Sequence, residues 1–359
     1  MPNKLRIATF NLENLDDTPP LHPATEPTFA ERVALIRPQL IRLRADILCL
    51  QEVFGQGQEE HLSLRALETL LADTPYIGFN RVSTGKFASP TITENLVLPV
   101  DIIPSTGNGQ SVNHERNLVL LSHLDILEGR QIKYFYVSPP SYRTITALYP
   151  QPDPQAEDHA KAEPIGLERP LLYVKVRLSP TQIIHVIVVH LKSKIPTEIP
   201  GQKESQYVWK TASGRAEGSF ISSMKRIGQA VEVRRLVDTL FDDDEDALIA
   251  VCGDFNAEQS EVSLEAIRGD IEDTENPRLV KRVLVPCEKT VPESSRFSLF
   301  HHGRGNMLDH ILVSRSLLAF YRGAEIHNEL LHDKSSAFVT NKMFPESDHA
   351  PVIAEFELP

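Results

Sequence analysis

The stretch ALIAVCGDFN, residues 247–256, shows the pattern that decides the fold: a short apolar run that ends abruptly in polar side chains. Similar runs rich in β-branched residues recur along the chain, for example IIHVIVVH at 183–190, and we interpret them as strands. Between the strands, apolar residues at spacings of three and four predict helices over residues 29–43, 62–71 and 220–231. The fold class is therefore α/β or α+β.

Local signals refine two of these helices. Thr28 and Glu31 form a capping box at the start of the first, and we expect Pro38 to kink or divide it. The third is indicated by apolar residues at helical spacing, which are Phe220, Met224, Ile227 and Val231.

Composition excludes several classes of protein. With 41% hydrophobic and 24% charged residues, the 359-residue chain is neither disordered nor fibrous. Its 37 basic and 49 acidic residues give a net charge of −12, so any grip on nucleic acid must be local. Three cysteines without paired spacing favour a reducing compartment. No signal peptide or transmembrane segment is expected, and we predict a cytoplasmic monomer.

Two long segments interrupt the strand pattern. Residues 139–170 contain seven prolines, and residues 193–219 contain three glycines. Long loops inside compact domains are more often functional than not. Because the strand pattern resumes unchanged after each one, we interpret them as excursion loops of a single domain over residues 1–359.

The polar residues at the strand ends suggest one common site. Four strands deliver polar groups at their carboxyl ends; these are Asn11, Glu52, His190 and Asp254. Two later strands begin just after such groups, which are Asp309 and the pair Asp348–His349. If the first four strands run up and the last two run down, all these side chains meet at one rim.

The residue types at this rim point to phosphate chemistry. Carboxylates with an asparagine amide and no thiolate make an oxygen-rich site suited to Mg²⁺ or Mn²⁺. Spacing of two residues also places Glu13 on the face of Asn11 and Asn256 on the face of Asp254 in extended chain. Histidines nearby titrate near neutrality, so metal-assisted hydrolysis of a phosphate ester is the predicted reaction.

Six motifs carry a family resemblance. They are TFNLEN (9–14), LQEV (50–53), VVHLKSK (188–194), CGDFNAE (252–258), LDHILVS (308–314) and SDHAPV (347–352). In this order they resemble the endonuclease/exonuclease/phosphatase superfamily of deoxyribonuclease I-like enzymes. The resemblance implies a four-layered fold, with two mixed β-sheets packed face to face and helices on the outside.

The resemblance also implies roles on the metal side of the site. Glu52 would be the principal ligand, with Asn11 and Asp348 close to the same ion. Glu13 is interpreted either as a surface residue or as an outer ligand.

The remaining motif residues would act on the phosphate and the water. Asp254 and Asn256 flank the attacked phosphorus, and His190 lies on the opposite side of the scissile group. His349, oriented by Asp309, contacts phosphate or activates water. Whether Asp254 or His349 is the base stays open.

Two further residues are assigned by weaker similarity. Arg169 resembles an arginine that touches phosphate, and Glu115 resembles the carboxylate that partners the histidine at position 190. Both could instead be surface residues, and the proline-rich segment before Arg169 departs from the family pattern.

Substrate identity is the least determined property. Residues 192–226 carry seven basic and three acidic residues, beginning with Lys192, and Tyr207 and Trp209 could stack on bases. An ordinary solvated surface explains the same charges equally well. We expect a nuclease or phosphodiesterase. The alternatives are a phosphatase or phospholipase-type enzyme acting on inositol phosphates, nucleotides or sphingomyelin-like lipids, and an inactive binding module.

Overall fold

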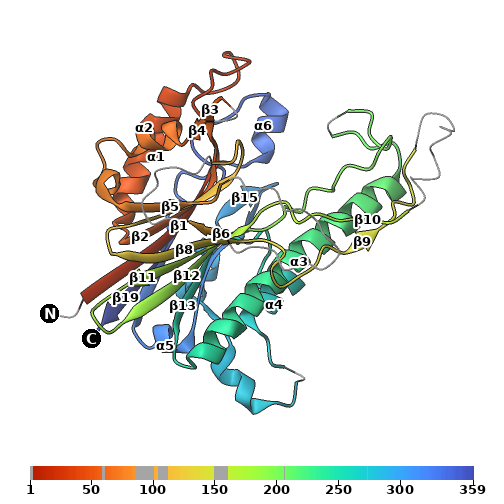
Figure 1. The fold of residues 1–359 in the computed structure, drawn as a ribbon. Coiled ribbons are helices and arrows are strands. Elements are labelled where there is room, and N and C mark those ends of the chain that lie inside the picture. Colours follow the sequence, from red (N-terminus) through yellow and green to blue (C-terminus); the bar gives the residue numbers. More distant parts are fainter. Residues whose placement is uncertain are drawn as a thin grey trace.

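Two large mixed β-sheets pack face to face and form the centre of the protein (Figure 1). This is a computed structural model, and it describes residues 3–58, 61–85, 101–103, 112–148, 161–205, 207–272 and 274–359. The first sheet has the order β18 (Tyr321–Ile326), β19 (Val352–Leu358), β1 (Asn3–Leu15), β2 (Ile47–Val53), β7 (Asn117–Ser122) and β5 (Asn80–Ser83). The second has the order β14 (Val285–Pro286), β17 (Asp309–Val313), β13 (Leu248–Asp254), β12 (Ile183–His190), β11 (Leu171–Arg177), β8 (Ile126–Ile132) and β6 (Asp101–Ile103).

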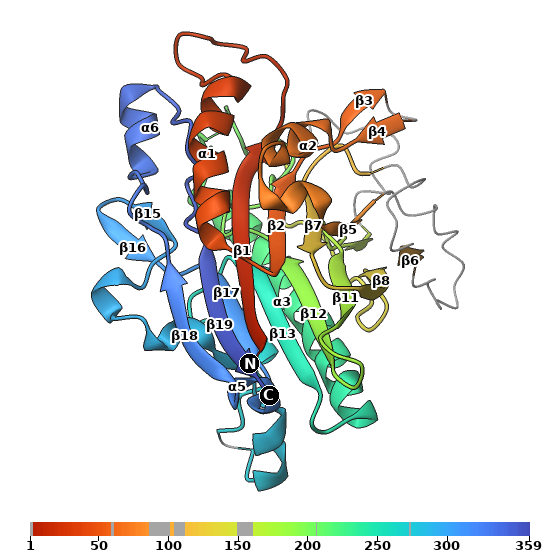
Figure 2. The same cartoon turned by 90° about the vertical axis from the view of Figure 1, so that its left-hand side faces the viewer.

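Helices cover the outer faces of both sheets, so the predicted four-layered fold is confirmed (Figures 1 and 2). Helices α1 (Phe29–Leu43) and α2 (Arg65–Leu71) pack on the first sheet, and α3 (Ala212–Asp243) and α4 (Val262–Arg268) pack on the second. The smaller elements are α5 (Arg315–Leu318), α6 (Ser335–Thr340) and the two-stranded pairs β3 (Gln56–Gln58) with β4 (His61–Ser63), β9 (Ser141–Tyr142) with β10 (Glu163–Pro164), and β15 (Leu299–His301) with β16 (Arg304–Asn306).

Strand alternation produces the core. Residues such as Ile7, Cys49, Val186 and Cys252 meet between the two sheets, and their chain neighbours face the helices. Burying apolar surface on both faces of each sheet is the main stabilising term of such a fold. Within the described residues, no helix has the length and apolarity needed to cross a membrane.

The strand directions carry polar groups to one rim, as predicted. β1 runs parallel to β2, and β12 runs parallel to β13. β19 is antiparallel to β1, and β17 is antiparallel to β13. Consequently the carboxyl ends of four strands and the amino ends of two lie on the same side of the sandwich.

The first helix agrees with its sequence signals except at its proline. Thr28 accepts a hydrogen bond from Glu31 N and Glu31 bonds back to Thr28 N, which completes the capping box. Pro38 does not divide the helix, which is continuous from Phe29 to Leu43. Both Pro38 and Ala34 are exposed, so water can satisfy the Ala34 carbonyl that loses its partner.

The third predicted helix is confirmed as part of α3, but the apolar positions that indicated it do not form its inner face. Phe220, Ile227 and Val231 are exposed in α3, while Ala230, Val233 and Val237 face the second sheet. The inner face of α3 also carries polar residues, among them Glu232, whose carboxylate accepts the backbone N–H groups of residues 135–137. A hydropathy pattern cannot predict a helix face that buries charged groups with specific partners.

The excursion loops differ in outcome. Residues 212–219 are not loop, because they form the first two turns of α3, capped by the Thr211 side chain on Gly214 N. The glycines that suggested a loop allow close packing there: a Cβ on Gly218 would lie 2.4 Å from the carbonyl oxygen of Thr197. In the segment 139–170, β9 pairs with β10, and residues 149–160 lie outside the described residues.

Candidate active site

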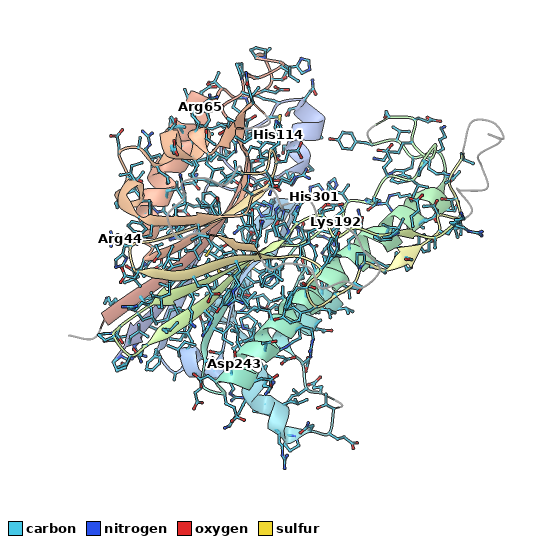
Figure 3. All side chains as sticks on the ribbon, viewed as in Figure 1. Arg44, Arg65, His114, Lys192, Asp243 and His301 are labelled. Carbon is cyan, nitrogen blue, oxygen red and sulfur yellow. The ribbon has the colours of Figure 1, made fainter. Side chains whose placement is uncertain are left out.

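Three predicted site residues lie side by side across the second sheet. His190 at the end of β12 pairs in register with Asp254 at the end of β13, and Asp254 pairs with Asp309 at the start of β17. Asn256 and His349 complete this group, which we call the sheet cluster (His190, Asp254, Asn256, Asp309 and His349). All five are buried. Figure 3 places the labelled Lys192, two residues after β12, at this end of the sandwich, and Asp243 near the opposite end.

Asp254 is oriented by amide donors on both sides. Its Oδ2 accepts hydrogen bonds from Asn256 Nδ2 (2.9 Å) and from Asn11 Nδ2 (3.1 Å), and its Oδ1 accepts from Asn256 N (2.8 Å). The second Nδ2 hydrogen of Asn256 is donated to the carbonyl of Leu191 (3.0 Å). Asn256 therefore fixes Asp254 to the loop after β12, and its amide is already engaged.

Asp309 and His349 form a buried pair. His349 Nδ1 lies 2.7 Å from Asp309 Oδ2, and Asp309 N is bonded to Ser298 Oγ (3.0 Å). Burial opposes the charged imidazole, but the carboxylates of Asp309, Asp348 and Asp254 raise the pKa of His349 well above its ordinary value. These carboxylates therefore favour the protonated form of His349, whose Nε2 lies 3.8 Å from Asp348 Oδ1.

His190 has the opposite electrostatic character. Burial and the positive charge of Arg169 lower the pKa of His190 well below its ordinary value. Its Nε2 lies 3.3 Å from Asp254 Oδ2 and 3.4 Å from Glu52 Oε1. His190 therefore lies between two carboxylates that come from different sheets.

The metal-side residues, Asn11, Glu13, Glu52 and Asp348, form a second group, which we call the turn cluster. Glu13 (φ 47°), Asn14 (φ 51°) and Glu52 (φ 59°) are all in the left-handed region. Register shifts between Asn11 and Leu15, and between Leu50 and Val53, mark bulges at these positions. Bulges near active sites re-aim side chains, and here they turn two glutamates toward the rim.

Backbone amides join the carboxylates of the turn cluster. Glu52 Oε2 accepts from Asn14 N (3.0 Å), and a carboxylate oxygen of Glu13 accepts from Asp348 N (2.9 Å). Burial and the Asp348 carboxylate raise the pKa of Glu13 to about 8. Burial opposes ionisation of Asp348, but the charges of His349 and Lys334 hold its pKa below the ordinary value.

One cation lies directly on this acidic group. Lys334 Nζ forms an ion pair with Asp348, and the pKa of Lys334 is raised to about 12: burial opposes its charge, but Asp348, Glu13 and Glu52 outweigh it. The segment that carries Lys334 is anchored, since Lys334 N donates to the Phe300 carbonyl (2.9 Å). The group thus accommodates a positive charge, and its donors are the carboxylate and amide oxygens that suit Mg²⁺ or Mn²⁺.

A second set of donors is found in the sheet cluster. One ligand atom each from Asp254, Asp309 and His349 lie within 4.8 Å of one another, and Asp309 Oδ1 has no hydrogen-bond partner among the described residues. These three side chains are therefore close enough together to hold a cation.

The two residues assigned by weaker similarity differ in position. Arg169 is buried, donates to the carbonyl of Leu191 (3.0 Å), and lowers the pKa of His190. Glu115 is exposed at a turn closed by Asn117, and the structure does not bring it to His190. Within the described residues, His190 Nδ1 has no hydrogen-bond partner.

Most basic residues of the segment 192–226 form contacts inside the protein. Lys192 is buried and bonds to Ser193 Oγ (3.1 Å) and the Ile195 carbonyl (3.2 Å). The other engaged cations are Lys194 with Glu261, Lys203 over the Trp209 ring, Lys225 with Glu168, and Arg226 on the carbonyls of residues 192 and 193. Tyr207 is 66% exposed on this loop. Internal contacts, and not a role in substrate binding, therefore account for most of these basic residues.

Several contributors were missed at the sequence level. Arg32, Ser298, Lys334 and Ser347 all contact the rim, and Ser347 Oγ donates to the Asn11 carbonyl (2.7 Å). Ser347 lies within the SDHAPV motif, so its position was a usable signal. Lys334 and Arg32 are in segments whose proximity to the site follows only from the folded chain.

Comparisons with known proteins agree with the fold. Humanized D. rerio TDP2 carrying 14 mutations is 13% identical, with 99% of each chain covered and a TM-score of 0.53. An endonuclease/exonuclease/phosphatase family protein from Bacteroides thetaiotaomicron is 15% identical, covering 100% of this chain and 96% of its own, with a TM-score of 0.53. The 3′ phosphatase NExo from Neisseria, bound to a product DNA hairpin, is 14% identical, covering 98% and 99%, with a TM-score of 0.50.

Sequence comparison gives the family itself. A search of curated proteins found no match. The model of the Endonuclease/Exonuclease/phosphatase family matches residues 8–349, which include the first five motifs and Ser347, Asp348 and His349 of the sixth. The chain therefore belongs to this family of phosphoester hydrolases.

Proposed function

We propose that this protein is a divalent-metal-dependent phosphodiesterase, most readily a nuclease, that cleaves its substrate by in-line attack of water on phosphorus. The observation that carries the proposal is the meeting of the two clusters at one rim. His190 Nε2 lies within 3.4 Å of both Glu52 and Asp254, so the two carboxylates face a common space. Six motifs spread over the chain contribute to it.

The turn cluster would hold the ion. Glu52 and Asp348 are the principal carboxylates, with the Asn11 amide and Glu13 beside them. Mg²⁺ or Mn²⁺ in such a site neutralises charge on the non-bridging phosphate oxygens. The Lys334 ammonium on Asp348 supports this assignment, because it shows that the group favours a cation.

The sheet cluster would move the proton and bind the phosphate. Asp254 is held by Asn11 and Asn256 and is placed to accept a proton from water. The carboxylate neighbours of His349 raise its pKa, which favours a role as donor to a phosphate oxygen over a role as base. We therefore assign the base to Asp254.

The preference for diesters over monoesters is the finer part of the proposal. DNA-bound neighbours of the same fold are consistent with nucleic acid as the substrate. A phosphomonoesterase is the second candidate, because most cations of residues 192–226 are engaged inside the protein and offer little surface for a polyanion. The free, buried thiols of Cys49, Cys252 and Cys287 support a reducing, cytoplasmic location.

The deciding experiment compares substrates directly. Hydrolysis of bis(p-nitrophenyl) phosphate, p-nitrophenyl phosphate and a DNA oligonucleotide is measured side by side with Mg²⁺, Mn²⁺ and EDTA, using Asp254→Asn as the inactive control. Faster diester cleavage that EDTA abolishes supports the proposal. Faster monoester cleavage supports the second candidate, and activity that survives EDTA contradicts metal dependence.

A further inference from the structure

Arg32 ties together the two chain segments that supply the turn cluster. It lies in the first turn of α1, and its guanidinium donates to three backbone carbonyls: Leu12 (2.7 Å), Asn14 (3.1 Å) and Pro345 (3.4 Å). The first two are at the end of β1, and the third lies three residues before Asp348. One side chain therefore spans the junction between distant parts of the sequence.

The carbonyls that Arg32 holds flank the residues that orient the carboxylates. Glu13 lies between Leu12 and Asn14, and its carboxylate accepts the Asp348 N–H. The N–H of Asn14 is donated to Glu52. Glu13 and Asn14 both adopt left-handed backbone conformations, which non-glycine residues keep only when their surroundings impose them.

We propose that Arg32 is a positioning residue: by fixing the Leu12, Asn14 and Pro345 carbonyls it holds Glu13, Glu52 and Asp348 in the arrangement that binds the divalent ion. The inference rests on the proposed function for the identity of the ligand, but not for the backbone clamp itself. Arg32 does not touch substrate or metal in this assignment.

Charge and geometry predict opposite results when Arg32 is removed. The guanidinium acts electrostatically on Glu13, Asp348 and Glu52. If its charge alone mattered, its loss would remove a positive charge that repels the ion, and a divalent cation would bind more tightly. If the clamp matters, the carboxylates lose their arrangement and the cation binds more weakly. The sign of the change separates the two.

The same helix contains a matched control. Arg37 also donates to backbone carbonyls, those of Leu70 (3.1 Å) and Thr69 (2.6 Å), but these belong to α2 and its end rather than to the site. Arg37→Gln therefore removes an equivalent helix-to-backbone contact without affecting the rim.

The experiment measures binding of Mn²⁺ alone to the full chain by calorimetry. Arg32→Gln should weaken binding about tenfold, the typical effect of losing a partner that orients metal ligands. Arg32→Lys keeps the charge but cannot span three carbonyls, and it should also weaken binding, whereas Arg37→Gln should not. Tighter or unchanged binding by folded Arg32→Gln overturns the proposal.

Hydrogen–deuterium exchange tests the clamp without any metal. The amides of Asn14 and Asp348 should exchange faster in Arg32→Gln and Arg32→Lys than in the wild type, and not in Arg37→Gln. Equal exchange in all four proteins overturns the proposal. If the wild type does not bind Mn²⁺ yet this exchange pattern appears, the metal assignment fails while the clamp stands.

Discussion

The sheet cluster and the turn cluster lie at the same rim but are held by different forces. In the sheet cluster, His190, Asp254 and Asp309 occupy matching positions on neighbouring strands, so backbone pairing sets their spacing. In the turn cluster, Glu13 and Glu52 lie at bulges with left-handed backbone. Their positions depend on a few side-chain and amide contacts.

The two clusters therefore differ in how firmly their side chains are held: the proposed catalytic groups are fixed by the sheet, and the proposed metal ligands depend on individual contacts. Buried, hydrogen-bonded groups in a sheet are preorganised and tolerate little change. The turn-cluster carboxylates, of which Glu13 and Glu52 are half-buried and Asp348 is buried, depend on contacts of Lys334 and Arg32 that a single substitution removes. We therefore expect substitutions in the sheet cluster to affect turnover most, and substitutions around the turn cluster to affect metal affinity.

The largest effect is expected for Asp254→Asn. The new amide cannot accept a proton, and its NH₂ group would face the donors of Asn11 and Asn256. Turnover of a diester at saturating Mg²⁺ should fall about 1,000-fold. Near wild-type turnover, with an unchanged circular dichroism spectrum, would contradict the assignment of the base.

Asp309→Asn should have the next largest effect and should change the pH profile. The Asp309 carboxylate helps to raise the pKa of His349, so its loss lowers that pKa and the imidazole loses its proton at a lower pH. Turnover should fall about 100-fold, and the alkaline limb of kcat/KM should move to lower pH. An alkaline limb that does not move would show that His349 does not act as the charged donor.

Lys334→Gln is expected to act on the turn cluster with the opposite sign to Arg32→Gln. Removing the ammonium from Asp348 frees a carboxylate, so Mn²⁺ should bind about tenfold more tightly, equivalent to ~1.4 kcal/mol. Lys342→Gln, at an exposed position nearby, is the control for net charge. Glu52→Gln, which removes a proposed ligand, should weaken Mn²⁺ binding. If Lys334→Gln also binds Mn²⁺ more weakly than the wild type, the prediction fails, and Lys334 instead stabilises the arrangement of the site.

The smallest effect is expected away from both clusters. Lys210 and Arg215 are exposed cations of the segment 192–226. Replacing both with Gln should change KM for a DNA oligonucleotide by less than about threefold at 0.15 M salt, since isolated exposed charges contribute little. A larger change that disappears at high salt would restore a polyanion-binding role for this surface.

The sequence was sufficient for the architecture and for most of the rim. Apolar runs that stop at Asn11, Glu52, His190 and Asp254 predict both the strands and the edge where they end, because the carboxyl ends of parallel strands lie together. The same logic failed for α3, where Glu217 and Glu232 are buried against loop amides. Those partners are far away in sequence.

What the sequence determined by itself was which residues arrive at the rim, since strand direction and period two are local properties of the chain. Only the tertiary structure decided how they are aimed and charged. Their aim depends on the bulges at Glu13 and Glu52. It also depends on contacts between segments that are distant in the sequence, which are the Lys334 ion pair and the Arg32 clamp. Their electrostatic consequences, such as the opposite pKa shifts of His190 and His349, arise from burial and neighbouring charges that no linear pattern contains.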